Sequence, residues 1–82
     1  MENVLFSDRI QIERKLFFFD LKENPRGRFL KITEDVSGRR DTIIVPTSGL
    51  EHFRESLEKV LDEEKKRRAQ DPQPPPEVSG PA

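Results

Sequence analysis

The sequence predicts an α+β domain in which a four-stranded antiparallel sheet is followed by one C-terminal helix. In the first half of the chain, apolar residues recur at every second position, as they do in half-buried strands. From residue 48 onward they recur at every third or fourth position, as they do in amphipathic helices. The predicted order is therefore ββββα, with strands at about 5–13, 16–23, 28–34 and 41–46 and a helix at about 49–67.

The second and third predicted strands are joined by a tight turn. Phe17, Phe19 and Leu21 repeat with period two before it, and the turn itself reads Asn-Pro-Arg-Gly over residues 24–27. Asn favours the first position of such a turn, Pro presets φ at the second, and Gly favours the fourth. Strand 28–34 then places Leu30 and Ile32 on one side and Phe29, Lys31 and Thr33 on the other.

The fourth strand follows a polar segment. Residues 35–39 include Ser-Gly and are predicted to form a loop. Residues 42–45 are β-branched throughout, which suits a strand, and Pro46 stops it because proline cannot donate to the ladder.

The helix carries an apolar stripe formed by Leu50, Phe53, Leu57, Val60 and Leu61. Ser48 and Glu51 have the spacing of a capping box, which predicts the start of the helix. Residues 1–68 are therefore assigned to one folded repeat. Residues 69–82 hold five of the seven prolines and little apolar surface, so they are predicted to form a disordered, proline-rich tail.

About 70 residues are close to the lower limit for a domain that folds alone, because small domains bury a low fraction of their surface. Apolar residues also occupy both sides of strand 16–23, where Leu16 and Phe18 oppose Phe17 and Phe19. A second copy of the chain would cover the surplus apolar surface. The expected state is therefore a homodimer.

The composition excludes several function classes. The chain has no Cys and one His, so no cofactor and no metal site are expected, and no catalytic triad, P-loop or acid–base pair is recognisable. His52, beside Phe53 in the first helical turn, is expected to face solvent. The longest apolar run has four residues, from Leu16 to Phe19, too short to cross a membrane. The expectation is a non-enzymatic protein with no small-molecule substrate and a cytoplasmic location.

Charge is distributed unevenly along a nearly neutral chain. Residues 9–40 hold nine bases and five acids, whereas the rest of the chain holds six bases and eleven acids. Lys22, Asn24, Phe29 and Lys31 fall on the side of the sheet opposite its predicted core. Cations that contact phosphates and an open ring that stacks on a base are the combination that single-stranded nucleic acid requires. A basic sheet whose Phe29 is half-buried in a dimer contact explains the same pattern equally well.

Residues 12–32, IERKLFFFDLKENPRGRFLKI, closely resemble the repeat of the purine-rich-element binding proteins, the PUR repeat family. Leu21 to Ile32 is the most specific part, and the resemblance extends over roughly residues 5–64. It implies a ββββα whirly-like fold in which two repeats intertwine. Since this chain has one repeat, it resembles the single-repeat bacterial type, in which two chains supply the two repeats. The resemblance also implies binding of single-stranded DNA and RNA, often G-rich, with some capacity to open duplexes.

The family's Lys-x-Asn-x-Arg pattern falls on Lys22, Asn24 and Arg26, and its base-stacking aromatic falls on Phe29. Additional phosphate contacts are expected from four further cations: Arg28, Lys31, Arg14 and Lys15. Asn24 would either contact a base edge or hold the turn.

The chain departs from the family where members often read Gln-Asn-Lys-Arg. Here Glu13 would repel phosphate and Leu16 removes a cation, so contacts from the first hairpin are weakened. The alternative function is a structural dimerisation or protein-interaction module that uses the helix stripe and the tail.

Overall fold

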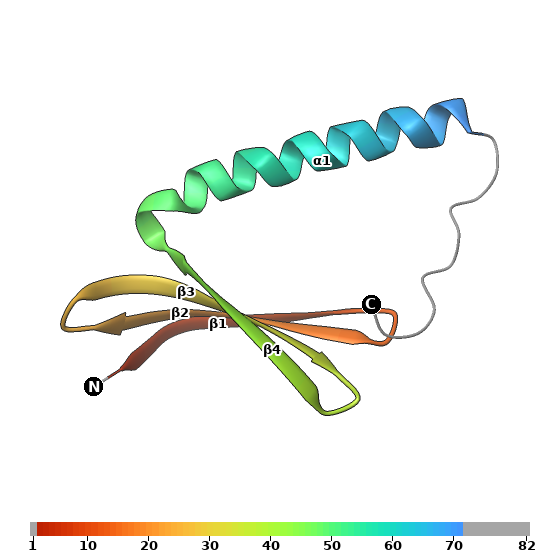
Figure 1. Ribbon diagram of the computed structural model, residues 1–82. Coiled ribbons are helices and arrows are strands. Elements are labelled where there is room, and N and C mark those ends of the chain that lie inside the picture. Colours follow the sequence, from red (N-terminus) through yellow and green to blue (C-terminus); the bar gives the residue numbers. More distant parts are fainter. Residues whose placement is uncertain (1, 72–82) are drawn as a thin grey trace. The chain divides into compact units, whose positions relative to one another are not determined.

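The computed structural model describes residues 2–71, which form the predicted four strands and one helix. The strands make a single antiparallel sheet in the order β1-β2-β3-β4, so each strand pairs with the next one along the chain (Figure 1). The elements are β1 Asn3–Ile12, β2 Lys15–Asn24, β3 Gly27–Val36, β4 Arg39–Pro46, a 3₁₀ turn Thr47–Gly49, and α1 Leu50–Gln70. The predicted α+β fold class and element order are confirmed.

The turns make the sheet more regular than predicted. The proposed loop over residues 35–39 is wrong, because β3 continues to Val36 and only Ser37 and Gly38 connect it to β4. Both connecting residues have positive φ, 54° and 86°, which is the requirement of the type I′ hairpin turn. The Asp35 carboxylate accepts a hydrogen bond from the Gly38 N–H at 3.0 Å and so stabilises this turn.

The capping-box prediction for the helix start is also wrong. The 3₁₀ turn shifts the first residue of α1 to Leu50, so Gly49 is the N-cap residue and no side chain caps the helix. At its other end α1 reaches Gln70, three residues past the predicted end at 67. Glutamate–arginine pairs four residues apart, Glu63–Arg67 and Glu64–Arg68 at 2.8 Å each, support these last turns. The predicted tail lies outside the described residues from residue 72 onward.

Cross-strand register divides the sheet into two chemically different faces. One face, called the apolar face below, carries the pairs Ile10–Phe17, Phe19–Ile32 and Ile32–Ile43. The opposite face carries the pairs Lys22–Phe29, Phe18–Thr33 and Lys31–Ile44, and is called the Phe29 face. Successive residues of a strand point to opposite faces, so the alternation predicted for the second and third strands matches the register.

Apolar surface remains uncovered in the described part of the chain. None of its apolar side chains is buried, and its one buried polar residue is Thr33, which is 6% exposed. Phe6 and Ile43, on the apolar face, are 62% and 54% exposed, and Val60 on the stripe of α1 is 65% exposed. Folding is driven mainly by removal of such surface from water. The described chain by itself therefore leaves much apolar surface in contact with water.

Candidate nucleic-acid interface

Phe29 lies at one end of the Phe29 face beside an open hollow of about 600 Å³. Its cross-strand neighbours are Lys22 on β2 and Pro46 on β4, and its side chain is half-buried. The residues around the hollow come from three strands, the β2–β3 turn and the start of the chain: Glu2, Asn24, Arg26, Gly27, Arg28, Phe29, Ile44 and Pro46. The lining thus combines apolar, polar and cationic groups with one carboxylate, that of Glu2.

Asn24 holds the β2–β3 turn. Its Oδ1 atom accepts a hydrogen bond from the backbone N–H of Arg26 at 2.9 Å, an arrangement typical of Asn at the start of a turn. The amide nitrogen of Asn24 keeps its two donor hydrogens, because the turn uses only the oxygen. The same side chain can therefore fix the turn and donate to an acceptor on a ligand.

Arg26 is the exposed tip of this turn. No ion pair involves its guanidinium within residues 2–71, so its five donors and its charge face solvent beside the hollow. A planar guanidinium in this position is suited to a phosphate oxygen or a base edge.

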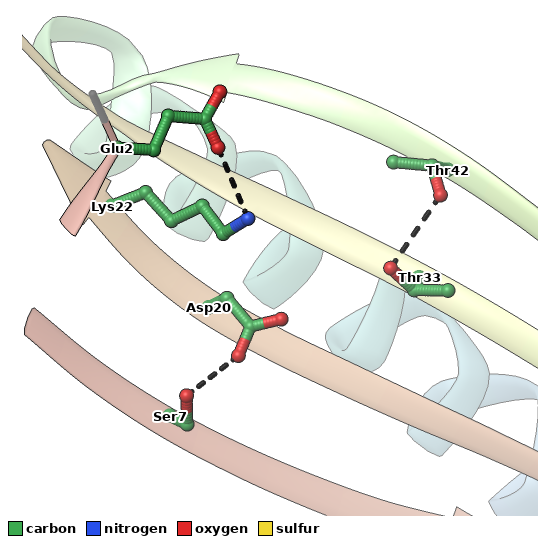
Figure 2. Close-up of polar contacts among 6 residues, drawn as sticks. All are labelled: Glu2, Ser7, Asp20, Lys22, Thr33 and Thr42. Carbon is green, nitrogen blue, oxygen red and sulfur yellow. Dashed lines mark hydrogen bonds and ion pairs between the residues drawn. The ribbon is translucent and has the colours of Figure 1, made fainter. Parts of the chain in front are cut away.

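Lys22 is more constrained than the sequence suggested. Its Nζ atom lies 3.2 Å from Oε1 of Glu2, and its side chain is only 16% exposed (Figure 2). The carboxylate of Glu2 thus competes for the ammonium group that the sequence predicted to bind phosphate.

Lys31 extends the cationic surface along β3. It faces Asp20 on β2 and Ile44 on β4 across the strands. Asp20 accepts a hydrogen bond from the Ser7 hydroxyl at 2.6 Å (Figure 2). The ammonium group of Lys31 forms no ion pair among the described residues. Lys31 is thus a half-buried cation about two residues along the sheet from the Lys22–Phe29 pair.

Three of the predicted site residues do not lie on the Phe29 face itself. Arg28 points to the apolar side of β3 but borders the hollow from the turn end, with its Nε 3.7 Å from the Glu23 carboxylate. Lys15 lies on the apolar face and pairs with Glu34 at 2.9 Å. Arg14 is in the β1–β2 turn at the opposite end of the sheet, where it borders a second hollow with Arg39.

Sequence reasoning missed the contributions of the fourth strand and of the chain start. Ile44 and Pro46 supply part of the lining of the hollow beside Phe29, and Glu2 supplies the acid that pairs with Lys22. Strand alternation predicts that Ile44 and Ile43 point to opposite faces of the sheet. It does not predict which residues of β3 lie beside Ile44, because that depends on the register. No sequence signal links Glu2 to a residue 20 positions away.

Other chemistry is sparse in the described residues. Residues 2–71 contain no cluster of His, Asp or Glu that could hold a metal ion, and none of their helices is long and apolar enough to span a membrane. His52 is solvent-facing, as predicted, with 87% of its side chain exposed and a contact to Glu55 at 3.6 Å.

Comparison with known proteins identifies related sequences. Residues 1–79 match the family described as PurA ssDNA and RNA-binding protein. The transcription factor Pur-alpha 1 of Arabidopsis thaliana is 63% identical over 49 residues, which cover 60% of this chain and 17% of that protein. The transcriptional activator protein Pur-alpha of Homo sapiens is 39% identical over 66 residues, which cover 72% of this chain and 20% of that protein. The human purine-rich element-binding protein gamma is 31% identical over 74 residues, which cover 74% of this chain and 21% of that protein. The chain thus spans about a fifth of the length of these relatives.

Proposed function

This chain belongs to the PurA family, and on that premise we propose that it binds single-stranded DNA or RNA on the Phe29 face of its sheet. One observation carries the proposal: an aromatic ring, an amide donor and an unpaired guanidinium surround a single open hollow. These are the groups of Phe29, Asn24 and Arg26. Relatives described as transcription factors and activators support a role in regulating gene expression.

Each group has a distinct part in the proposed complex. A base that stacks on Phe29 gains on the order of 1–3 kcal/mol and does so whatever its identity. Arg26, Lys31 and, once released from Glu2, Lys22 neutralise phosphates, which contributes affinity without sequence information. The amide nitrogen of Asn24 donates to an acceptor on a base edge, and purines offer N7 and, in guanine, O6 as such acceptors. This supports a preference for purine-rich strands.

The proposal extends to duplex opening. Phe29 projects from near the start of β3 beside a hollow, and an apolar side chain in such a position can insert between stacked bases. Unstacking costs a few kcal/mol per step, and binding of the released strand by the same face offsets that cost.

We propose further that the binding unit is a homodimer formed through the apolar face and the stripe of α1. The supporting observation is that none of the apolar side chains in residues 2–71 is buried in the single chain. Association of two copies would supply the missing core, and isologous contacts are the commonest way in which identical chains associate. The two Phe29 faces would then belong to one particle.

Salt dependence of binding tests the nucleic-acid proposal. For a single strand, log K falls with log salt by about 0.7 per neutralised phosphate. We therefore expect Lys22→Ala combined with Arg26→Ala to weaken binding of every oligonucleotide sequence and to reduce this slope by about 1.4. Lys65→Ala combined with Lys66→Ala removes the same charge from α1 and is the matched control. Fluorescence anisotropy with labelled oligonucleotides of about ten bases, purine-rich and pyrimidine-rich, measures both quantities.

Two outcomes would contradict the proposed site. Equal weakening by the two double variants would assign binding to overall charge rather than to the Phe29 face. Absence of binding by the intact wild-type protein at low salt would instead favour the alternative, a dimerisation or protein-interaction module.

A further inference from the structure

A second aromatic residue, Phe18, lies on the Phe29 face and is held by an arginine. The guanidinium carbon of Arg40 is 5.3 Å from the centre of the Phe18 ring, which is within cation–π distance. The Nε atom of Arg40 is also 2.9 Å from the Asp35 carboxylate. Arg40 belongs to β4, Asp35 to β3 and Phe18 to β2, so the arginine side chain crosses the middle strand.

Thr33 lies on the same face of β3, the strand that the Arg40 side chain crosses. It is the cross-strand neighbour of both Phe18 and Thr42, and its hydroxyl lies 3.5 Å from that of Thr42 (Figure 2). It is also the most buried of the described residues. The Arg40 side chain is itself 63% exposed, so the Phe18–Arg40 pair lies at the surface, where a ligand can reach it.

The pair has a free cation on its other side. Arg9 on β1 is the cross-strand neighbour of Phe18, and it forms no ion pair within the described chain. Arg9 and Phe18 border an open hollow of about 310 Å³, together with Ser7, Asp8 and Asp20. The oxygen of Asp20 is engaged by the Ser7 hydroxyl, and Asp35 is engaged by Arg40. Asp35 and Asp20 therefore already have partners, and Asp8 falls on the opposite face by strand alternation.

We propose that Phe18, Arg40 and Arg9 form a second nucleotide-binding platform for the strand that the Phe29 site binds. A base stacks on the Phe18–Arg40 pair, since both an aromatic ring and a guanidinium plane are stacking surfaces for bases. Arg9 contacts the phosphate of the same nucleotide. The inference rests on the proposed function, because it concerns a second nucleotide of the same ligand.

The spacing of the two platforms sets the strand length that uses both. Phe29 faces Lys22, and Phe18 lies four residues before Lys22 on the neighbouring strand. At about 3.3 Å per residue and 4.8 Å between strands, the two aromatic positions are about 14 Å apart. That distance corresponds to about four steps of a stacked strand at 3.4 Å per base. An oligonucleotide of about three bases therefore reaches one platform, and one of about ten bases reaches both.

The test compares these two oligonucleotide lengths. Phe18→Leu keeps most of the apolar volume but removes the ring, and Arg40→Gln removes the charge at an exposed position. We expect each variant to bind the longer strand about five- to tenfold more weakly, which is the lower part of the effect of one stacked base. Binding of the shorter strand should be affected less, because that strand still binds at the Phe29 platform. Phe6→Leu makes the same substitution on the apolar face and is the control.

Photocrosslinking identifies the platform directly. Single-stranded oligonucleotides carrying 5-iodouracil should crosslink to both Phe18 and Phe29, as mapped by peptide mass spectrometry. Crosslinks at Phe29 alone, or equal affinities of Phe18→Leu and Phe6→Leu for the longer strand, would overturn the second platform and leave the first intact. If Phe29 forms no crosslink and the Lys22→Ala, Arg26→Ala double variant binds oligonucleotides as tightly as wild type, the proposed function itself is overturned.

Discussion

The Nζ atom of Lys22 lies 3.2 Å from a carboxylate oxygen of Glu2, and Glu2 also borders the hollow beside Phe29. A phosphate that approaches Lys22 would be repelled by this carboxylate and would compete with it for the ammonium group. Glu2 is therefore expected to weaken phosphate binding at Lys22, the lysine of the Lys-x-Asn-x-Arg pattern.

We expect Glu2→Gln to strengthen binding of single strands. Partly exposed ion pairs contribute about 0.2–1 kcal/mol, so the gain should reach up to about fivefold at low salt and shrink as salt rises. Anisotropy titrations at two salt concentrations measure it. The control is Glu58→Gln, which breaks the Arg54–Glu58 pair on α1 and changes the net charge equally. If both variants gain alike, net charge rather than competition at Lys22 is responsible.

Phe29→Ala should impair duplex opening more than it impairs binding. Single-strand affinity retains the phosphate contacts, whereas opening depends on a group that inserts between bases. A short duplex labelled with a fluorophore and a quencher reports opening, and anisotropy reports binding. Ile44→Ala removes a neighbouring apolar side chain without a ring and provides the comparison. A proportional loss in both assays would show that Phe29 acts in binding alone.

Two substitutions of Asn24 separate its role in the turn from its proposed role as a donor to a base. Asn24→Ala removes the acceptor for the Arg26 N–H and should lower stability by about 1 kcal/mol, or about 4–8 °C in Tm for a domain of this size. Asn24→Asp keeps an acceptor oxygen and should leave Tm nearly unchanged. Both variants lack the amide donor, so both should bind purine-rich strands more weakly. Unchanged affinity of Asn24→Asp would restrict Asn24 to holding the turn.

The element order and the two faces could be predicted from the sequence because both follow from local periodicity. Phe17, Phe19 and Leu21 specify one side of a strand whatever lies beside it, and the Asn-Pro-Arg-Gly turn fixes the next strand as antiparallel. Helix start and loop length were less predictable. Ser48 has the residue type of a cap, but the 3₁₀ turn that displaces it depends on how the chain leaves β4.

The remaining site residues depend on pairing between distant positions. Arg40 reaches Phe18 across β3 because the two-residue turn at Ser37 and Gly38 sets Arg40 opposite Asp35. The predicted five-residue loop would have shifted that register and hidden the relationship. Contacts that depend on register, including that of Pro46 with Phe29, become visible only when the turns are known.

Two adjacent residues of β4 provide a test of the proposed homodimer. Ile43 and Ile44 are each 54% exposed in the single chain, yet Ile43 lies on the apolar face and Ile44 on the Phe29 face. We expect wild type and Ile44→Lys to be dimers in sedimentation equilibrium, with a Tm that rises with protein concentration because folding and association are linked.

Ile43→Lys should dissociate or unfold at the same concentration, since it places a charge in the core that two copies would form. The two variants have the same composition and differ only in which face receives the ammonium group. If Ile43→Lys retains the mass and Tm of a dimer, the apolar face is not the surface through which two chains associate. If wild type is a stable monomer whose Tm is independent of concentration, the exposed apolar residues do not require a second copy.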